Sequence, residues 1–322
     1  MTKEEASILI KQKAYELGFS ACGIAKAEAV DASAVAEQEE WLAKGFAAGM
    51  DYMHKNKNLR YDPRELVPGA KSLIIVAMNY YPKQEVQSDV SFAYYSYGKD
   101  YHFVLKKYLS YLFKYIEEEI APFLCPNIEV EGRCFTDSAP MMERYWAKKA
   151  GVGFQGRNRL IIVPKVGSFC FLGTLAVNID LSADHPLNIS CGKCHKCEES
   201  CPTHAICSGF VDSNKCISYQ TIENRTDNIP DSVAASMGSN IYGCDICQKV
   251  CPWNRFAKAT SIPEFSPSDN FMKIDSAIIE NMASGDFKRL FKETAVVRAG
   301  LKNLKRNLEC VKKTFDSSRI DD

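Results

Sequence analysis

Hydrophobic and polar positions in the first half of the chain follow two kinds of pattern. Compact apolar runs bounded by glycine, proline or polar residues predict buried strands at 19–24, 73–78, 159–163 and 169–179. Apolar side chains at helical spacing predict helices at 103–120 and 139–150. Strands and helices therefore alternate, and residues 1–180 are expected to form one domain of mixed α/β (α+β) class.

The rest of the chain is expected to be built differently. Thr2 and Glu5 have the spacing of a capping box that opens a helix ending at Gly18. From about Asp286, apolar residues recur at spacings of four and three and predict a helix with a buried stripe of Val297, Leu301, Leu304, Leu308 and Val311. The intervening composition of Cys, Ser, Asn and Pro is typical of a small domain with a partly inorganic core. The expected order is a mixed domain (1–180), a cysteine-rich domain (181–260) and a C-terminal helical segment (261–322).

The composition is that of an ordinary globular protein. Of 322 residues, 46% are apolar and 25% are charged, and 40 Lys and Arg balance 40 Asp and Glu, which argues against disorder and against a surface devoted to polyanions. The longest apolar stretches, at 72–81 and 169–179, are shorter than the roughly 20 residues that a membrane helix needs. The charged residues after Met1 do not resemble a secretory signal. We therefore expect a cytoplasmic protein without a membrane span.

Fourteen cysteines are unusual for such a protein, and they concentrate after residue 190. At this density in a reducing compartment, cysteines are more often metal ligands than disulfide partners. Four of them match the C-x2-C-x2-C-x3-C-P run of two-cluster ferredoxins, in which three thiolates hold one 4Fe-4S cluster and the fourth reaches a second. These four are Cys191, Cys194, Cys197 and Cys201.

A second cluster requires further ligands. Cys244, Cys247 and Cys251 repeat the end of the motif, and Cys216 is the candidate for the missing ligand, with Cys207 as its competitor. Crossed pairing predicts one cluster on Cys191, Cys194, Cys197 and Cys251, and another on Cys201, Cys216, Cys244 and Cys247. Two alternatives stay open: structural zinc on CxxC motifs, and a ferredoxin-type electron carrier whose first domain only docks a partner.

The first domain contains one segment with candidate chemistry. Residues 133–158 have the pattern of a strand, a turn, a helix and a glycine-rich loop. The three glycines of that loop would let the backbone approach a bound molecule closely. Asp137 lies at the predicted strand end before the helix, where an aspartate is either a site residue or an ordinary N-cap. This segment alone does not identify a ligand.

Taken together, these motifs resemble the epoxyqueuosine reductase family, the cobalamin and iron–sulfur enzymes of tRNA queuosine synthesis. The resemblance covers nearly the whole chain, including both cysteine runs and the segments at 60–63, 95–102, 137–158, 219–223 and 242–254. It implies an oxidoreductase that reduces epoxyqueuosine to queuosine at the wobble position of tRNA. It also implies two 4Fe-4S clusters and cobalamin bound with its lower base off the cobalt. A more distant resemblance, to corrinoid reductive dehalogenases, is the alternative.

The resemblance also implies site residues. Asp137 matches the proton donor of the family, and a pKa raised toward working pH is expected for that role. The residues that match cobalamin contacts are Arg60, Tyr95, Asp137, Gly153, Gly156, Arg157 and Asn158. His102 lacks the following glycine of base-off/His-on proteins, because Leu105 stands there. We therefore expect His102 to be satisfied locally at a helix start rather than to bind cobalt.

Partners follow from the same resemblance. We expect a monomer that acts on tRNA carrying epoxyqueuosine in its anticodon loop and takes electrons from an external low-potential donor. Longer relatives carry a C-terminal extension, so the C-terminal helical segment is expected to be a truncated version. Its basic residues outside the apolar stripe are expected either to contact RNA phosphates or to remain solvated. These residues are Arg298, Lys302, Lys305, Arg306, Lys312 and Lys313.

Overall fold

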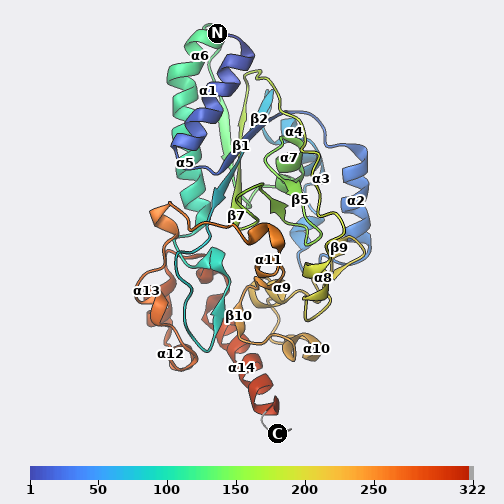
Figure 1. Cartoon of the computed structure of the whole chain (residues 1–322), viewed down its shortest axis with the longest axis vertical. Helices are drawn as coiled ribbons and strands as arrows, with labels where there is room; N and C mark the ends of the chain where they lie inside the picture. The colour runs from blue at the N-terminus through green and yellow to red at the C-terminus, as the bar shows by residue number, and fades with distance from the viewer. Residues whose placement is uncertain (319–322) are drawn as a thin grey trace.

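The computed structural model describes residues 1–318, with side chains described through Lys313. Its centre is a four-stranded sheet with the order β1-β2-β7-β4, in which all neighbouring strands are antiparallel. The strands are β1 (Ala21–Lys26), β2 (Ser72–Asn79), β7 (Cys170–Val177) and β4 (Gly132–Phe135). Helices cover both faces of this sheet (Figure 1). The mixed class is confirmed, and the antiparallel pairing makes it the α+β kind.

The helices around the sheet largely follow the sequence pattern. They are α1 (Lys3–Glu16), α2 (Ala32–Ala43), α3 (Lys57–Tyr61), α4 (Pro63–Leu66), α5 (Tyr101–Tyr115), α6 (Ala121–Leu124) and α7 (Glu143–Lys149). The Thr2 and Glu5 side chains each accept the other's backbone N–H, so the capping box is confirmed. A π-helical turn at Ile116–Ile120 continues α5 as predicted, whereas the helix predicted at 139–150 begins later, at Glu143. Within residues 1–318, no helix combines the length and apolarity needed to cross a membrane.

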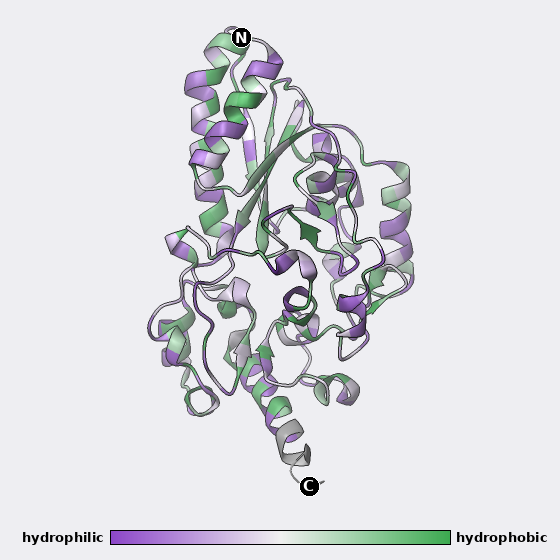
Figure 2. Cartoon of the chain, in the orientation of Figure 1, coloured by the Kyte–Doolittle hydropathy of each residue, from purple (hydrophilic) through white to green (hydrophobic). Residues whose placement is uncertain are grey.

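The apolar run at 73–78 forms β2, which pairs on both sides. Its even-numbered residues from Ile74 to Met78 share a core with Ile10 of α1 and Leu109 of α5. Its odd-numbered residues from Leu73 to Ala77 pack in a second core with Trp146 of α7. A strand covered on both faces needs no polar alternation, which explains the continuous apolar pattern. By contrast, α1 and α5 each carry both apolar and polar residues along their length, as Figure 2 shows.

The glycine-rich segment folds as a small hairpin. The strand predicted at 159–163 is shorter in the structure, where β6 (Ile161–Ile162) pairs with β5 (Phe154–Gln155). Gly153 is required there, because a Cβ atom would lie 2.6 Å from the Ile162 carbonyl oxygen. The hairpin packs on the cysteine-rich segment through the Phe154 and Trp253 rings, whose centroids are 5.0 Å apart.

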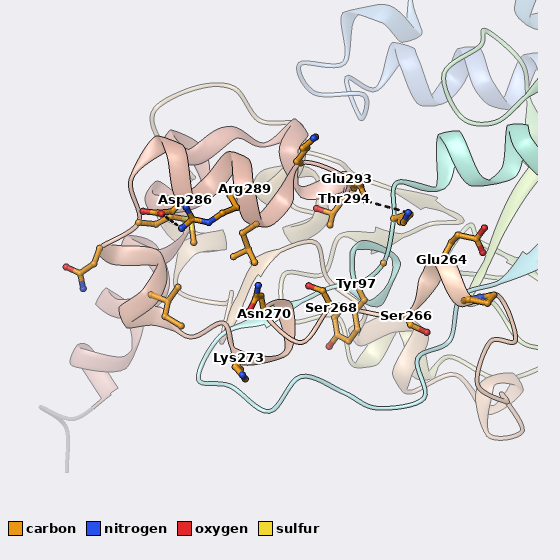
Figure 3. A pocket seen from close by; sticks show the side chains of 18 residues that line it. Tyr97, Glu264, Ser266, Ser268, Asn270, Lys273, Asp286, Arg289, Glu293 and Thr294 are labelled. Atoms are coloured by element: carbon orange, nitrogen blue, oxygen red, sulfur yellow. Dashed lines mark hydrogen bonds and ion pairs between the residues drawn. The ribbon is translucent and has the colours of Figure 1, made fainter.

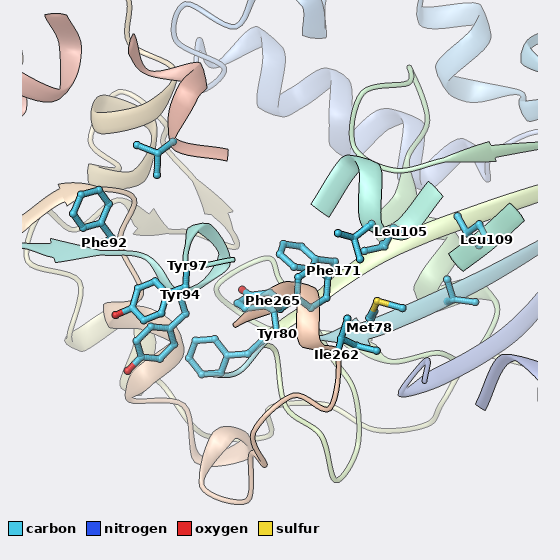
Figure 4. Close-up of a cluster of buried hydrophobic side chains, with 14 of the residues drawn as sticks. Met78, Tyr80, Phe92, Tyr94, Tyr97, Leu105, Leu109, Phe171, Ile262 and Phe265 are labelled. Carbon is cyan, nitrogen blue, oxygen red and sulfur yellow. The ribbon is translucent and has the colours of Figure 1, made fainter. Parts of the chain in front are cut away.

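The cysteine-rich segment consists of short elements: α8 (Lys196–Glu199), β8 (Ile206–Cys207), β9 (Phe210–Val211), α9 (Ile217–Ile222), α10 (Asp231–Ala234), β10 (Asn240–Tyr242) and α11 (Ile246–Lys249). Strand β10 pairs in parallel with β3 (Ser91–Phe92), which joins segments on both sides of the predicted boundary at residue 180. Figure 4 shows Phe92 and Tyr97 extending the buried cluster that also contains Leu105 and Phe171 beside the sheet. One hydrophobic core therefore runs through both parts.

The C-terminal segment is not the single helix predicted from Asp286. After the 3-10 turn η4 (Pro252–Asn254), which ends the cysteine-rich segment, its elements are the 3-10 turns η5 (Pro263–Phe265) and η6 (Phe271–Lys273), α12 (Ser276–Glu280), α13 (Ser284–Phe291), the 3-10 turn η7 (Ala295–Arg298) and α14 (Gly300–Ser318). Thr294 caps η7, and Gly300 has a φ of +74°, so the chain turns twice before α14. Val297 is 42% exposed, and its place in the predicted stripe is therefore wrong. The stripe holds within α14, where Leu304, Leu308 and Val311 are buried.

Arg306 corrects the expectation that the basic residues of α14 face solvent. It is buried, and its guanidinium donates to the carbonyl oxygens of Gln220, Asn224 and Thr226. It therefore fixes the loop after α9 and is not available to an RNA phosphate. Lys302 keeps an exposed side chain, which pairs with Asp227.

Candidate active site

Asp137 lies in the loop after β4, with a backbone φ of +56° that aspartate tolerates better than most residues. Its Oδ2 atom accepts a 2.6 Å hydrogen bond from the Tyr101 hydroxyl and lies 3.3 Å from Nε2 of His102. Nη1 of Arg298 is 3.9 Å from the same oxygen. The N-cap alternative is wrong, because α7 begins at Glu143 with Met142 as its N-cap residue.

His102 connects this carboxylate to a second one. It is buried in the first turn of α5, with Nδ1 2.6 Å from Oδ1 of Asp100, which also accepts the His102 backbone N–H at 3.0 Å. The expected local satisfaction at a helix start is therefore confirmed. The opposite ring nitrogen, Nε2, faces Asp137 and lies 2.8 Å from Nη2 of Arg298. Asp100, His102 and Asp137 form a continuous chain across the site, which the sequence analysis did not foresee.

The electrostatics of Asp137 differ from those expected. Burial would raise the pKa of this carboxyl, but hydrogen bonds from His102 and Tyr101 and the charges of His102 and Arg298 lower it to about 2. The carboxyl is therefore ionised at neutral pH, and the raised pKa expected for a proton donor is wrong for this arrangement. The Asp137 side chain is nevertheless 56% exposed. A molecule that covered it would remove water and favour the protonated form.

Glu143 supports the Asp137 loop from α7. Its Oε1 accepts the backbone N–H of Asp137 at 2.8 Å. Burial and the negative charge of Asp137 raise the pKa of Glu143 to about 8, so this carboxyl is protonated at neutral pH. The charge of Asp137 also acts on Tyr52, in the 3-10 turn η1 (Asp51–Met53): burial and then the charges of Glu223 and Asp137 raise the pKa of Tyr52 to about 12. Side chains from α5, η7 and α7 thus contact Asp137. No periodic pattern in the sequence indicated Glu143 or Tyr52.

Three of the residues expected to contact a cofactor have polar atoms without a protein partner. Arg60 of α3 is buried, and its guanidinium donates to the Tyr52 carbonyl at 3.2 Å, but its Nε has no acceptor. Nε of Arg157 and Nδ2 of Asn158 are also buried without a partner. Buried donors ordinarily find acceptors. These three therefore fit a bound molecule that is rich in carbonyl or phosphate oxygens.

The remaining expected contacts have visible roles in the fold. Tyr95, in the 3-10 turn η2 (Tyr94–Ser96), sets its ring edge against Tyr101, with centroids 6.2 Å apart. Gly156 leaves room for the Asn158 side chain, since a Cβ atom would lie 2.8 Å from its Oδ1. Arg157 donates to the Gly192 carbonyl at 3.1 Å and so ties the hairpin to the first cysteine loop. Tyr95 thus adjoins the Asp137 site, and the glycines shape the hairpin that carries Arg157.

The cysteines of the first run lie together with the last one. Burial raises the pKa of the Cys251 thiol, and the neighbouring sulfurs of Cys191 and Cys194 raise it further. Burial likewise raises the pKa of Cys197, to which Glu198, Cys191 and Cys251 add. Exposed side chains surround this group: Lys193, His195 and Lys196. The first crossed set predicted from the sequence is therefore close in space and near the surface.

The second group is more deeply placed. Burial raises the pKa of Cys244 to about 12, with Cys216 and Cys201 adding to the shift. Cys216 directly precedes α9, whereas Cys207 pairs with Phe210 in the hairpin of β8 and β9. The arrangement favours Cys216 over Cys207 as the eighth ligand. Within the described residues, no three Cys, His, Asp or Glu side chains are close enough to hold a single metal ion.

A separate cavity of about 860 Å³ lies between the loop at 97–99 and the segment 263–294 (Figure 3). Its rim includes the ion pairs of Lys99 with Glu293 and of Asp286 with Arg289. None of the site residues expected from the sequence lines it. The cavity is therefore distinct from the Asp137 site.

Comparisons with known proteins bear on both halves of the site. The family model described as epoxyqueuosine reductase QueG, DUF1730, matches residues 60–138, which include Arg60, His102 and Asp137. The model described as a 4Fe-4S double cluster binding domain matches residues 190–254. The epoxyqueuosine reductase of Leadbetterella byssophila is 44% identical over 304 residues, which are 94% of this chain and 97% of that protein.

Solved structures agree with these matches. A crystal structure of epoxyqueuosine reductase with an epoxyqueuosine-modified tRNA-Tyr stem loop has a TM-score of 0.86 and 27% identity, covering 97% of this chain and 82% of that one. A Bacillus subtilis epoxyqueuosine reductase, described with its catalytic aspartate loop swung out of the active site, has a TM-score of 0.87 and 26% identity over 98% of this chain and 83% of that one. From its sequence, its fold and its double-cluster segment, this chain belongs to the epoxyqueuosine reductase family.

Proposed function

We propose that this protein reduces epoxyqueuosine to queuosine at the wobble position of tRNA. Conversion of the epoxide to an alkene takes two electrons and two protons and releases water. The observation that carries the proposal is the Asp137 site, where Tyr101 and His102 hold an exposed carboxylate. The unpartnered donors of Arg60, Arg157 and Asn158 support it. A double-cluster segment follows in the same chain. Family membership supports the choice of substrate.

We propose cobalamin, with its lower base off the cobalt, as the molecule bound at the Asp137 site. The buried donors of Arg60, Arg157 and Asn158 fit the amide and phosphate oxygens of such a molecule. The full set of proposed contacts is Arg60, Tyr95, Asp137, Gly153, Gly156, Arg157 and Asn158. When bound and reduced, cobalamin supplies the low-potential electrons that no protein side chain can provide.

Asp137 has the role of proton donor to the departing epoxide oxygen. Substrate bound over Asp137 covers its exposed side chain and excludes water, which favours the neutral carboxyl. Tyr101 orients this carboxyl, and Arg298 stabilises the carboxylate that remains after the proton has left. Proton transfer by a positioned side chain contributes on the order of 10²–10⁴-fold to the rate.

The cluster ligands are proposed in the crossed arrangement: Cys191, Cys194, Cys197 and Cys251 for one cluster, and Cys201, Cys216, Cys244 and Cys247 for the other. The electrostatic contacts among these thiols support both sets. The first set lies beneath exposed side chains and is the proposed entry point for electrons. The second set lies deeper.

The surroundings of the reaction complete the proposal. The protein acts as a cytoplasmic monomer and takes electrons from an external low-potential donor. Its functional regions are a cobalamin-binding domain (1–180), a double-cluster domain (181–260) and a C-terminal helical segment (261–322).

A substrate comparison tests the proposal. The anaerobic protein, loaded with iron, sulfide and cobalamin, is offered a chemical reductant with either epoxyqueuosine-containing tRNA or a halogenated phenol. Conversion of epoxyqueuosine to queuosine with no release of halide supports the proposal. Release of halide alone identifies a reductive dehalogenase, and reduction of a carrier protein with neither substrate converted identifies an electron carrier.

A further inference from the structure

A proton donor must be reloaded after each turnover, and one buried side chain connects Asp137 to the protein interior. His102 is 5% exposed, with Nε2 3.3 Å from Asp137 Oδ2 and Nδ1 2.6 Å from Asp100 Oδ1. The imidazole therefore lies between two carboxylates. The Asp137 side chain is exposed to solvent, whereas Asp100 is buried on the other side of the ring.

We propose that, once the next substrate covers Asp137, His102 returns a proton to it, while Asp100 holds the imidazole in the orientation that this transfer needs. The inference rests on the proposed function, in which Asp137 protonates the departing oxygen. His102 is therefore a reloading residue and Asp100 a positioning residue, because both act through Asp137 and are themselves buried.

The proton balance is simple. The Asp137 carboxyl gives its proton to the oxygen of the opening epoxide and becomes a carboxylate. The imidazolium of His102 then gives the Nε2 proton to Asp137 and becomes neutral, with its Nδ1–H still donated to Asp100. A solvent proton restores the imidazolium. One solvent proton is consumed for each proton delivered, and no electrons move in these steps.

The groups that face the ring support this cycle. Burial, which is the largest influence, and the charge of Arg298 lower the pKa of His102, but hydrogen bonds to Asp100 and Asp137 outweigh them and raise it above its ordinary value. The two hydrogen bonds therefore favour the charged form of the ring while Asp137 is a carboxylate. Once Asp137 is neutral, the favourable contact on that side is lost, while Arg298 remains.

Two further titratable groups adjoin the pair. The Tyr101 ring packs on the imidazole with centroids 4.0 Å apart, and its hydroxyl donates to Asp137. Glu143 stands behind Asp137 and is neutral at neutral pH, because burial and Asp137 raise its pKa to about 8. Neither is placed to exchange a proton with His102 directly. His102 therefore remains the group that connects Asp137 with Asp100.

A purely structural role for His102 is the competing explanation, since Asp100 and His102 also open α5. The variant His102→Gln separates the two, because its amide can still donate toward Asp137 but carries no exchangeable positive charge. His185→Gln is the matched control, since His185 is an exposed histidine. Both variants are prepared as cofactor-loaded protein.

The first readout does not depend on activity. NMR titration of histidine Cε1–H signals in the oxidised, loaded protein should give His102 a midpoint above those of the exposed histidines. Asp137→Asn should lower that midpoint by about one pH unit or more and leave the other histidines unchanged. An ordinary midpoint for His102, or one that Asp137→Asn does not move, overturns the proposal.

The second readout is the pH dependence of multiple turnover. Wild-type turnover should fall as the pH rises through the His102 midpoint. His102→Gln should lose that dependence and turn over roughly 10–10²-fold more slowly, with cobalamin content and tRNA affinity unchanged. His185→Gln should match wild type. An active His102→Gln with the wild-type profile overturns the reloading role but not the proposed function, whereas wild-type protein that converts no epoxyqueuosine overturns the proposed function itself.

Discussion

The Tyr101 hydroxyl donates a 2.6 Å hydrogen bond to Asp137, across 36 residues of sequence. The Tyr101 ring is stacked on Phe171 of β7, with centroids 4.3 Å apart and planes 6° from parallel. The orientation of the site carboxylate is therefore anchored in the central sheet through two aromatic rings. An aspartate with a positive φ on an otherwise open loop needs such an anchor to keep one position.

The role of Asp137 is tested by Asp137→Asn. The amide has nearly the shape of the carboxylate but cannot donate the required proton, so turnover should fall by about 10²–10⁴-fold. Cobalamin and iron content should be unchanged. The measurement is queuosine formed in tRNA per minute under saturating reductant.

Asp180→Asn is the matched control, because the Asp180 side chain is 52% exposed and pairs with the surface residue Lys3. It should retain full turnover. Near-normal turnover by Asp137→Asn would contradict the proton-donor role.

The eighth cluster ligand is tested by two serine variants. Cys216→Ser should hold fewer than the eight irons expected of two intact four-iron clusters, because Cys216 lies with Cys201 and Cys244. Cys207→Ser should keep about eight irons. The measurement is iron and sulfide per chain after anaerobic reconstitution, and the reverse result would assign Cys207 instead.

Glu143 should make stability depend on pH. Its pKa is raised from 4.5 to about 8 in the folded chain, so between these values the carboxyl is neutral when folded and ionised when unfolded. Its contribution to stability is therefore fully present below about pH 4.5 and is lost as the pH rises to about 8.

Glu143→Gln removes this dependence and still offers an oxygen to the Asp137 backbone N–H. The variant should have the wild-type thermal midpoint at pH 4.5 and a higher one than wild type at pH 8.5. An equal difference between the two proteins at both pH values would show that Glu143 does not titrate in this range.

Arg306 should stabilise the fold rather than bind RNA. Arg306→Ala leaves several buried carbonyl oxygens without a donor, which should cost about 2–3 kcal/mol and lower the thermal midpoint of the loaded protein. Lys302→Ala, at an exposed position on the same helix, should leave the midpoint unchanged. Equal thermal midpoints for the two variants would show that Arg306 does not stabilise the fold.

How much the sequence could predict depended on whether the signal was local. The apolar run at 73–78 identified β2, and the capping box identified α1, because each depends on neighbouring residues. The cysteine spacing likewise pointed to the grouping of the thiols. The helix predicted from Asp286 failed because a Thr cap and a glycine with positive φ interrupt an otherwise helical apolar pattern.

The site itself depended on contacts that no local pattern encodes. Asp137 was found through resemblance, but its partner Arg298 comes from η7, and sequence spacing assigned Arg298 to a solvated helix face. The low pKa of Asp137 follows from that long-range arrangement. Residues that meet only after folding, such as Tyr101 and Asp137, therefore determine the chemistry of the site. The sequence alone could not predict these contacts.

The most direct test of the account is a single-turnover measurement. Loaded protein is reduced anaerobically, freed of reductant and mixed with excess epoxyqueuosine-containing tRNA, and both nucleosides are quantified over time. The account predicts that each epoxyqueuosine lost appears as one queuosine, that wild type and Asp180→Asn react alike, and that Asp137→Asn reacts at least about 10²-fold more slowly. Loss of epoxyqueuosine without queuosine, or no reaction by fully loaded and reduced wild-type protein, would contradict it.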